Sequence, residues 1–146
     1  AFVHHVFNVQ ARFGGQGGKL NNVRILLAED NMLNAEIAMT LLADANAYVE
    51  LAPDGEKALS MLKRATDGYY DLIIMDIQMP HMNGYEATKN IRGLPDGRCR
   101  IPIIAMTANA FEEDRKRAIE SGMNGYVTKP IKIEELISTI KKILKS

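Results

Sequence analysis

The sequence predicts an α/β protein with a doubly wound parallel sheet, and three observations support this prediction. Residues 72–75 and 103–106 are short apolar runs, a pattern typical of strands buried on both faces. Segments with helical spacing of apolar residues alternate with such strands, and five strand–helix units follow residue 22. Parallel strands need crossover connections, which are right-handed and place helices on both faces of the sheet. We therefore expect a three-layer (βα)5 sandwich around a five-stranded parallel sheet.

Composition restricts the class of protein. The 146 residues suit one domain, which would bury about two thirds of its unfolded surface. The 18 basic and 18 acidic residues balance, so there is no electrostatic footprint for nucleic acid or an anionic membrane. Cys99 is the single cysteine, which excludes an intramolecular disulfide and favours a reducing compartment. No apolar run approaches the ~20 residues of a membrane span. We expect a cytoplasmic segment that contacts neither nucleic acid nor membrane directly.

The N-terminal part differs from the rest. Residues 1–11 alternate loosely between apolar and polar types, and four glycines between residues 14 and 18 give the composition of a flexible linker. We interpret residues 1–21 as a flexible leader: a tether, an expression remnant or the tail of a preceding segment. The folded domain is predicted to comprise residues 22–146.

The first strand–helix unit begins at residue 23. Residues 23–28 are apolar apart from Arg24 and predict a strand, and Asn31 is a candidate cap for the helix that follows. We expect that helix to bury four apolar residues at helical spacing: Leu33, Ile37, Leu41 and Leu42.

The next two units follow the same pattern. Residues 47–51 form a short predicted strand, and residues 53–55 form a turn. The helix behind this turn carries three apolar residues: Ala58, Leu59 and Leu62. The third predicted strand, residues 72–76, ends in an aspartate. A turn over residues 80–84 then leads into a helix near residues 85–92.

The last two units complete the prediction. After the strand at residues 103–106, a helix opens with acidic residues 112–114 and turns basic at residues 115–117, an order that suits the helix dipole. Ser121 and Gly122 end this helix, and Val127 belongs to the fifth strand. The final helix has one apolar face: Ile133, Leu136, Ile137, Ile140 and Leu144.

Ionisable residues lie at the ends of three predicted strands. Glu29 and Asp30 follow the first strand, Asp76 ends the third, and Lys129 follows the fifth. The carboxyl ends of the strands are where open α/β sheets bind ligands. Three clustered carboxylates are costly unless a cation joins them, and Mg²⁺ prefers oxygen ligands and commonly combines carboxylates with phosphate. The sequence therefore predicts a small magnesium and phosphoryl site.

Four short motifs follow the predicted strands in order. They are Glu29-Asp30, residues 75–84, residues 106–108 and residues 128–130. Together they resemble the receiver (response-regulator) domain of two-component phosphorelays, over about residues 22–146. The residues around Asp76 and the segment 106–110 are most similar to receivers attached to hybrid sensor histidine kinases. The resemblance implies a flavodoxin-like fold with strand order 2-1-3-4-5.

The resemblance also implies the chemistry of the site. Asp76 would be the nucleophile that takes a phosphoryl group from a phosphohistidine, and an aspartyl phosphate is a recognised covalent intermediate. Asp30 and Asp76 would bind Mg²⁺ directly, Glu29 through water, and the backbone carbonyl of Gln78 would complete the protein ligands. Mn²⁺ would be a substitute. Lys129 and the metal would position the phosphoryl group and stabilise its charge.

Further residues of the motifs imply a switch. The Thr107 hydroxyl and the Ala108 amide would donate hydrogen bonds to the phosphoryl group. As Thr107 moves, the ring of Tyr126 would turn inward and reshape the face formed by the fourth helix, fifth strand and fifth helix. The alternatives are a strand-end threonine without a role and a half-buried tyrosine that never moves. The Lys129–Pro130 bond is expected to be cis.

We therefore expect a phosphoacceptor domain that promotes its own phosphorylation and dephosphorylation but is not a turnover enzyme. Its partners would be a histidine kinase domain, a histidine phosphotransfer protein, or both. It is either the receiver segment of a hybrid histidine kinase or a stand-alone single-domain response regulator. In the first case, it could belong to the cytoplasmic part of a membrane-bound sensor kinase. The glycine-rich leader and the hybrid-like motifs favour the first.

Two other functions share parts of this pattern. A haloacid-dehalogenase-type phosphatase also forms an aspartyl phosphate, but it needs a second aspartate two residues after the nucleophile, where this chain has Gln78. A docking module would keep the fold without being phosphorylated. The intact set of acids, threonine and lysine argues against the docking module, because a scaffold needs no cluster of three carboxylates.

Overall fold

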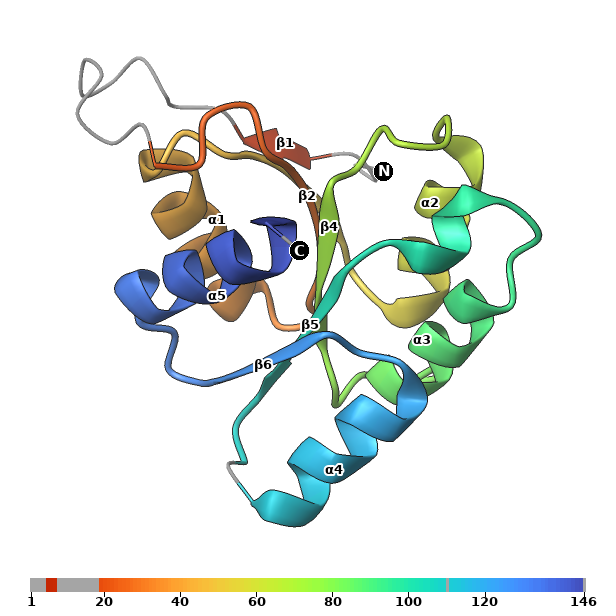
Figure 1. The fold of residues 1–146 in the computed structure, drawn as a ribbon. Coiled ribbons are helices and arrows are strands. Elements are labelled where there is room, and N and C mark those ends of the chain that lie inside the picture. The colour runs from red at the N-terminus through yellow and green to blue at the C-terminus, as the bar shows by residue number, and fades with distance from the viewer. Residues whose placement is uncertain (1–4, 8–18, 110, 146) are drawn as a thin grey trace.

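The computed structural model describes residues 5–7, 19–109 and 111–145, which form three layers around a central sheet (Figure 1). Helices α1 and α5 cover one face of the sheet, and α2, α3 and α4 cover the other. The strands are β1 (His5–Phe7), β2 (Arg24–Ala28), β3 (Tyr48–Ala52), β4 (Leu72–Asp76), β5 (Ile103–Thr107) and β6 (Gly125–Thr128). The helices are α1 (Met32–Asp44), α2 (Gly55–Arg64), α3 (Gly84–Arg92), the short 3-10 helix η2 (Gly97–Arg100), α4 (Glu112–Ser121) and α5 (Ile133–Lys145).

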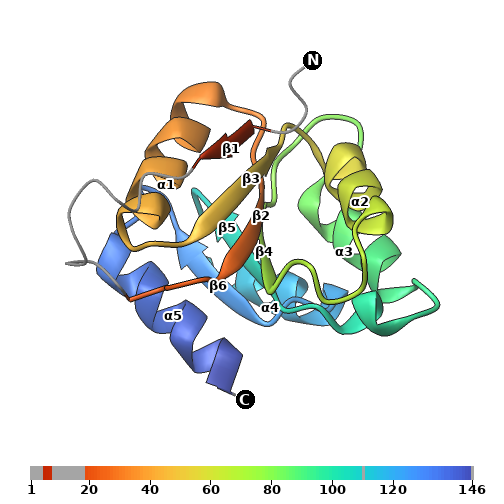
Figure 2. The same cartoon turned by 90° about the horizontal axis from the view of Figure 1, so that it is seen from above.

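The sheet confirms the predicted topology and adds one strand. Its order is β1-β3-β2-β4-β5-β6, and the five strands from β2 to β6 pair in parallel (Figure 2). Numbered among themselves, these five strands have the expected order 2-1-3-4-5. The sixth strand, β1, lies antiparallel to β3 at one edge of the sheet and was not predicted from the sequence.

The described part of the predicted leader is therefore structured in two places. Residues 5–7 form β1, and Leu20, which the sequence analysis assigned to the leader, is 1% exposed and packs with α1 and α5. The Leu20 amide also donates a hydrogen bond to the carbonyl of Ala45 at 2.8 Å. The rest of the predicted leader, residues 1–4 and 8–18, lies outside the described residues.

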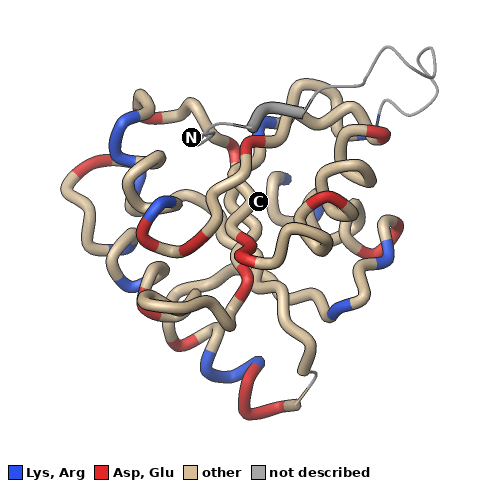
Figure 3. Tube along the Cα trace, turned by 180° about the vertical axis from the view of Figure 1, so that it is seen from behind, with Lys and Arg blue, Asp and Glu red and all other residues tan. Residues whose placement is uncertain are grey.

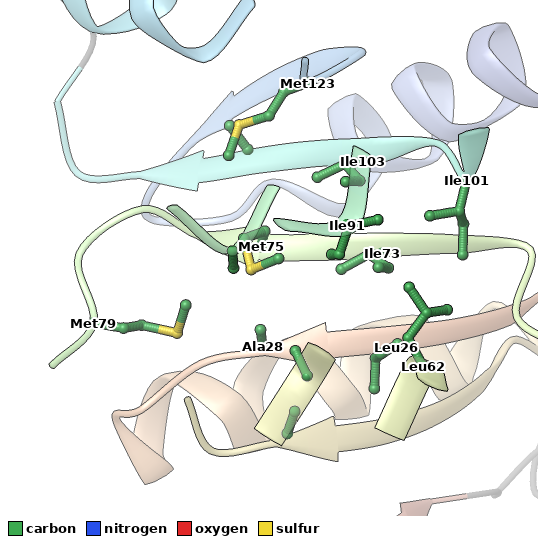
Figure 4. Packing of buried hydrophobic residues seen from close by; sticks show 14 of the residues in the cluster. Leu26, Ala28, Leu62, Ile73, Met75, Met79, Ile91, Ile101, Ile103 and Met123 are labelled. Carbon is green, nitrogen blue, oxygen red and sulfur yellow. The ribbon is translucent and has the colours of Figure 1, made fainter. Parts of the chain in front are cut away.

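The strands are buried on both faces, as the apolar runs predicted. Alternate residues point to opposite sides of a strand, so one run supplies two cores. Toward α2, α3 and α4 these include Leu26, Ile73, Met75 and Ile103 (Figure 4). Toward α1 and α5 they include Ile25, Leu27, Ile74 and Ile104. Each fully buried leucine or isoleucine contributes about 1.5–3 kcal/mol, which fixes the strand ends that carry the site.

Helix α1 differs from the prediction in the face that it buries. Leu33 is 66% exposed and Ile37 is 48% exposed, so the expectation that both are buried was wrong. The buried face consists instead of Ala35, Ala38, Met39, Leu42 and Ala43. This helix is apolar nearly all round, and the face with the small alanines is the one that packs on the sheet. The predicted cap is confirmed, because the Asn31 side chain accepts a hydrogen bond from the Asn34 amide at 2.9 Å.

Charged residues of both signs are interspersed along the chain (Figure 3). This distribution agrees with the equal numbers of acidic and basic residues in the sequence. None of the described helices combines the length and the apolar character that crossing a bilayer would require.

Candidate functional site

Three carboxylates meet at the carboxyl edge of the sheet, as the sequence predicted. Glu29 and Asp30 follow β2 and Asp76 is the last residue of β4, and these two strands pair side by side with Ala28 opposite Met75. One oxygen from each carboxylate lies within 4.8 Å of the others. Glu29 is fully buried and Asp76 is 3% exposed, whereas Asp30 faces solvent. The edge thus presents one acidic site that is open on one side.

Lys129 joins this cluster from the loop after β6. Its Nζ lies 3.1 Å from Glu29 Oε2 and 3.2 Å from Asp76 Oδ2. The Lys129 amide donates a hydrogen bond to the Thr107 carbonyl at 2.8 Å, which ties the loop to the end of β5. The Lys129–Pro130 peptide bond is cis, as expected from the resemblance. The lysine is therefore part of the site and not a solvated surface charge.

The electrostatics of the cluster follow from its burial. Desolvation and, after it, the neighbouring Asp76 carboxylate together raise the pKa of Glu29 to about 7. Burial by itself would lower the pKa of Lys129, but the charges of Asp76 and Glu29 outweigh this effect and raise it. The protonated lysine neutralises only part of the acidic charge, so the site favours a further cation.

Backbone amides hold the two buried carboxylates. The Asn31 amide donates to Glu29 Oε1 at 3.1 Å, and the Gln78 amide donates to Asp76 Oδ1 at 3.2 Å. Gln78 therefore lies directly beside the Asp76 carboxylate. Its side chain is exposed.

Gly84 packs against the backbone of Asp76. This contact was not predicted from the sequence, where Asn83 and Gly84 were assigned to a turn. Asn83 is in fact the N-cap of α3, in a reciprocal capping box with Glu86, and Gly84 is the first helical residue. A Cβ on Gly84 would lie 2.5 Å from the Asp76 carbonyl oxygen and 2.9 Å from Ile77 Cα. Only glycine lets α3 approach the end of β4 this closely. No sequence signal distinguishes this contact from an ordinary turn glycine.

A chain of hydrogen bonds connects Thr107 to Tyr126. The Asn109 amide donates to Thr107 Oγ1 at 3.2 Å, and the Asn109 carbonyl accepts a hydrogen bond from the Tyr126 hydroxyl. The guanidinium carbon of Arg115 lies 5.2 Å from the centre of the Tyr126 ring. Ala108, between Thr107 and Asn109, is exposed and directly follows β5. Thr107 and Tyr126 were predicted from their motifs, but the peptide group of Asn109 and the contact of Arg115 were not, because neither leaves a pattern in the sequence.

The donor set suits a magnesium ion. Among the described residues, Glu29, Asp30 and Asp76 are the one group of histidine, cysteine and acidic side chains spaced to hold a metal. All three offer oxygen atoms, which Mg²⁺ prefers over the nitrogen and sulfur ligands typical of zinc. His81 lies in the exposed loop after β4, with a left-handed backbone, and is not part of this group.

Comparison with known proteins finds one matching family model and relatives of very different lengths. The family model described as the response regulator receiver domain matches residues 25–141. Hybrid signal transduction histidine kinase M of Dictyostelium discoideum is 42% identical over 122 residues, which are 82% of this chain and 5% of that protein. An uncharacterized 14.6 kDa protein of Leptolyngbya boryana is 38% identical and is covered over 91% of its length by 84% of this chain. The chain thus spans a small fraction of the kinase relative and nearly all of the small one.

Two solved structures are informative. The receiver domain of a sensor histidine kinase from Pseudomonas aeruginosa PAO1, with magnesium coordinated in its active site cleft, is 39% identical with a TM-score of 0.77, and the match covers 86% of this chain and 99% of that one. The receiver domain in a Saccharomyces cerevisiae complex of a histidine phosphotransfer protein with its downstream response regulator is 30% identical with a TM-score of 0.73. That match covers 84% of this chain and 88% of the other.

Proposed function

The chain belongs to the response regulator receiver domain family, and we propose that it acts within a phosphorelay as the phosphoacceptor. The observation that carries this proposal is the convergence of Asp76 with Glu29, Asp30 and Lys129 at one edge of the sheet. Asp76 has the position of a nucleophile, because it ends its strand at the edge of the sheet and its carboxylate lies beside that of the solvent-exposed Asp30.

In the proposed step, a carboxylate oxygen of Asp76 attacks the phosphorus of a phosphohistidine. The P–O bond forms as the P–N bond of the donor breaks, and the imidazole leaves with the electron pair of that bond. Lys129 lies 3.2 Å from the attacking carboxylate and is placed to bind an oxygen of the incoming phosphoryl group. The Thr107 hydroxyl and the Ala108 amide, at the end of the adjacent strand β5, would bind the others.

The family implies a divalent cation, and the residues present fit one. Glu29, Asp30, Asp76 and the backbone carbonyl of Gln78 would hold Mg²⁺, with Mn²⁺ as a substitute. The bound ion supplies positive charge to the oxygens of the transferring phosphoryl group. The need for a cation agrees with the incomplete neutralisation of the three carboxylates by Lys129.

This proposal predicts magnesium-dependent modification by a small phosphodonor. With acetyl phosphate and Mg²⁺, the intact mass should increase by one phosphoryl group, and excess chelator should abolish the increase because the carboxylates then repel the donor. Intact mass spectrometry after a short incubation measures both. Equal modification with and without chelator would contradict the predicted cation site.

We propose that the hydrogen-bonded chain from Thr107 to Tyr126 is the switch. If Thr107 Oγ1 turns to the phosphoryl group, it leaves the Asn109 amide, and the Asn109 carbonyl and the Tyr126 hydroxyl must adjust with it. The cation–π contact from Arg115 couples this movement to α4. The outcome would be a new shape for the face formed by α4, β6 and α5.

The exposed face of α1 supports a protein as the phosphodonor. Met32, Leu33 and Ile37 are each about half exposed or more, and α1 begins two residues after Asp30. Exposed apolar side chains that cluster beside an active site indicate a protein contact. The partner would be a histidine phosphotransfer protein or the phosphohistidine-bearing domain of a kinase.

Leu33→Asn should therefore slow phosphotransfer from a histidine phosphotransfer protein by about fivefold or more, the effect of losing one well-packed interface residue. Its rate with acetyl phosphate should stay unchanged, since that donor needs no docking surface. Ile119→Asn is the matched control, because Ile119 is equally apolar and 57% exposed but lies on α4. Equal slowing by both variants would argue against docking on α1.

We further propose that the chain is the receiver segment of a hybrid histidine kinase in the cytoplasm. The hybrid kinase relative, of which the chain spans 5%, supports this assignment. The stand-alone response regulator is the alternative, and the small Leptolyngbya protein supports it. The phosphatase is disfavoured by Gln78, and the unphosphorylated docking module by the intact site.

A further inference from the structure

Strand β1 determines the edge of the sheet at which the N-terminal polypeptide enters the domain. Without β1, the chain would enter at Leu20 and the start of β2, which lie at the amino edge. Because β1 is antiparallel to β3, its first residue, His5, pairs with Leu51 and its last, Phe7, pairs with Val49. The strand β3 runs toward the carboxyl edge, so His5 is the residue of β1 nearest the edge that carries Asp76.

The amino edge, where β2 starts, and the carboxyl edge, where Asp76 lies, are far apart. Five residues of a parallel strand span about 17 Å, which is the separation between the amino and carboxyl edges of this sheet. The strand order places β1 three strands from β4, or about 14 Å to the side of the strand that carries Asp76, since strands are about 4.8 Å apart. With β1 paired, His5 thus lies toward the same edge of the sheet as Asp76, about three strands to its side.

From this geometry we propose that β1 is an intramolecular strap that fixes the approach of the preceding polypeptide to the phosphoacceptor edge. The partner that this arrangement fits is a phosphohistidine-bearing domain attached on the N-terminal side of the same polypeptide, and this choice of partner rests on the proposed function. Tethering such a donor at the carboxyl edge of the sheet raises its effective concentration near Asp76 without any new contact. The strap also covers the outer edge of β3, which would otherwise expose unpaired backbone groups.

The hydrogen-bond pattern of β3 identifies which residues the strap protects. The Tyr48 amide donates to the Val23 carbonyl at 2.8 Å, and the Ala52 carbonyl accepts from the Glu29 amide at 3.1 Å, so both residues face β2. Because successive backbone groups of a strand alternate in direction, the amides of Val49 and Leu51 face β1. The residues opposite them are Phe7 and His5, whereas the amide of Val6, between these two, faces away from β3.

This alternation provides a matched pair of variants. Phe7→Pro removes an amide that faces β3, and Val6→Pro removes one that faces outward, where edge strands tolerate proline. In the wild type the Val49 and Leu51 amides should exchange slowly with deuterium. In Phe7→Pro they should exchange about tenfold faster or more, since the strap opens locally, and in Val6→Pro they should stay protected. The Tyr48 amide, bonded to β2, should be protected in all three proteins.

The direction of the strap is tested separately. A spin label on Phe2→Cys, in a Cys99→Ser background, should broaden the amide signals of Asp54 and Gly55, which follow β3 at the carboxyl edge. The signal of Asn46, at the amino edge, should stay sharp, and Phe7→Pro should abolish this contrast. Broadening centred on Asn46 would overturn the proposal, as would fast exchange of Val49 and Leu51 in the wild type.

A third outcome would also overturn it. If spin-labelled protein broadens Asp54 in an isotope-labelled copy that carries no spin label, the strand is exchanged between molecules and is not an intramolecular strap. Neither measurement depends on phosphorylation. Failure of the proposed function would instead appear as absence of modification by acetyl phosphate, with the exchange pattern unchanged.

Discussion

Replacing Lys129 with methionine is expected to slow the modification of Asp76 by about 10²–10³-fold, the usual effect of removing one preorganised donor from a site of charge development. Lys129 Nζ lies within 3.2 Å of both Glu29 and Asp76, so its loss removes the cation that these two carboxylates share. The rate of gain in intact mass with acetyl phosphate and saturating Mg²⁺ measures the effect.

The matched control for this variant is Lys132→Met. Lys132 lies three residues further along and is exposed, so its loss should leave the rate unchanged. Circular dichroism should show that both variants are folded. A Lys129→Met protein that is folded and modified at the wild-type rate would exclude the lysine from the phosphoryl site.

The second large effect is expected at Gly84. Gly84→Ala places a methyl group where the Asp76 carbonyl oxygen would be 2.5 Å away, so α3 or the end of β4 must shift. Overpacking of this kind costs about 1–3 kcal/mol in the free energy of unfolding. Because the atom displaced belongs to Asp76 itself, modification by acetyl phosphate should also slow. Urea denaturation measures the stability, and intact mass measures the modification.

Gly93→Ala is the control, because Gly93 follows the last residue of the same helix. A Cβ there would have its nearest neighbour at 3.6 Å, which is ordinary van der Waals contact, and the backbone φ of −88° suits any residue. Its stability should differ from the wild type by about 0.5 kcal/mol or less. Equal destabilisation by the two substitutions would mean that the close approach at Gly84 is not what limits the site.

The sequence predicted the strand ends well, for a physical reason. A strand buried on both faces must be apolar throughout, so the carboxylates after residues 23–28 and at Asp76 mark the positions where the strands reach solvent. Parallel pairing then brings these ends to one edge whatever the details of packing. The fold class and the convergence of the three acids with Lys129 could therefore be expected from the residues, whereas the strand order was implied by the resemblance to receiver domains.

What could not be predicted depends on packing between distant segments. Helix α1 has apolar residues on every side, so periodicity could not decide that Leu33 and Ile37 face solvent. The burial of Leu20 follows from its contact with the end of α1, which lies 25 residues away at Ala45. β1 is too short to have a pattern of its own, and its pairing is decided by the free edge of β3.

The central claim is that Asp76 accepts the phosphoryl group. The most direct test is the intact mass after incubation with acetyl phosphate and Mg²⁺, compared between the wild type, Asp76→Asn and Asp71→Asn. Asp71 is the control because it directly precedes β4, the strand that Asp76 ends, and its side chain accepts a hydrogen bond from the Arg24 amide at the other edge of the sheet. We expect the wild type and Asp71→Asn to gain one phosphoryl group and Asp76→Asn to gain none. A gain of the same size in Asp76→Asn would place the acceptor elsewhere and contradict the account.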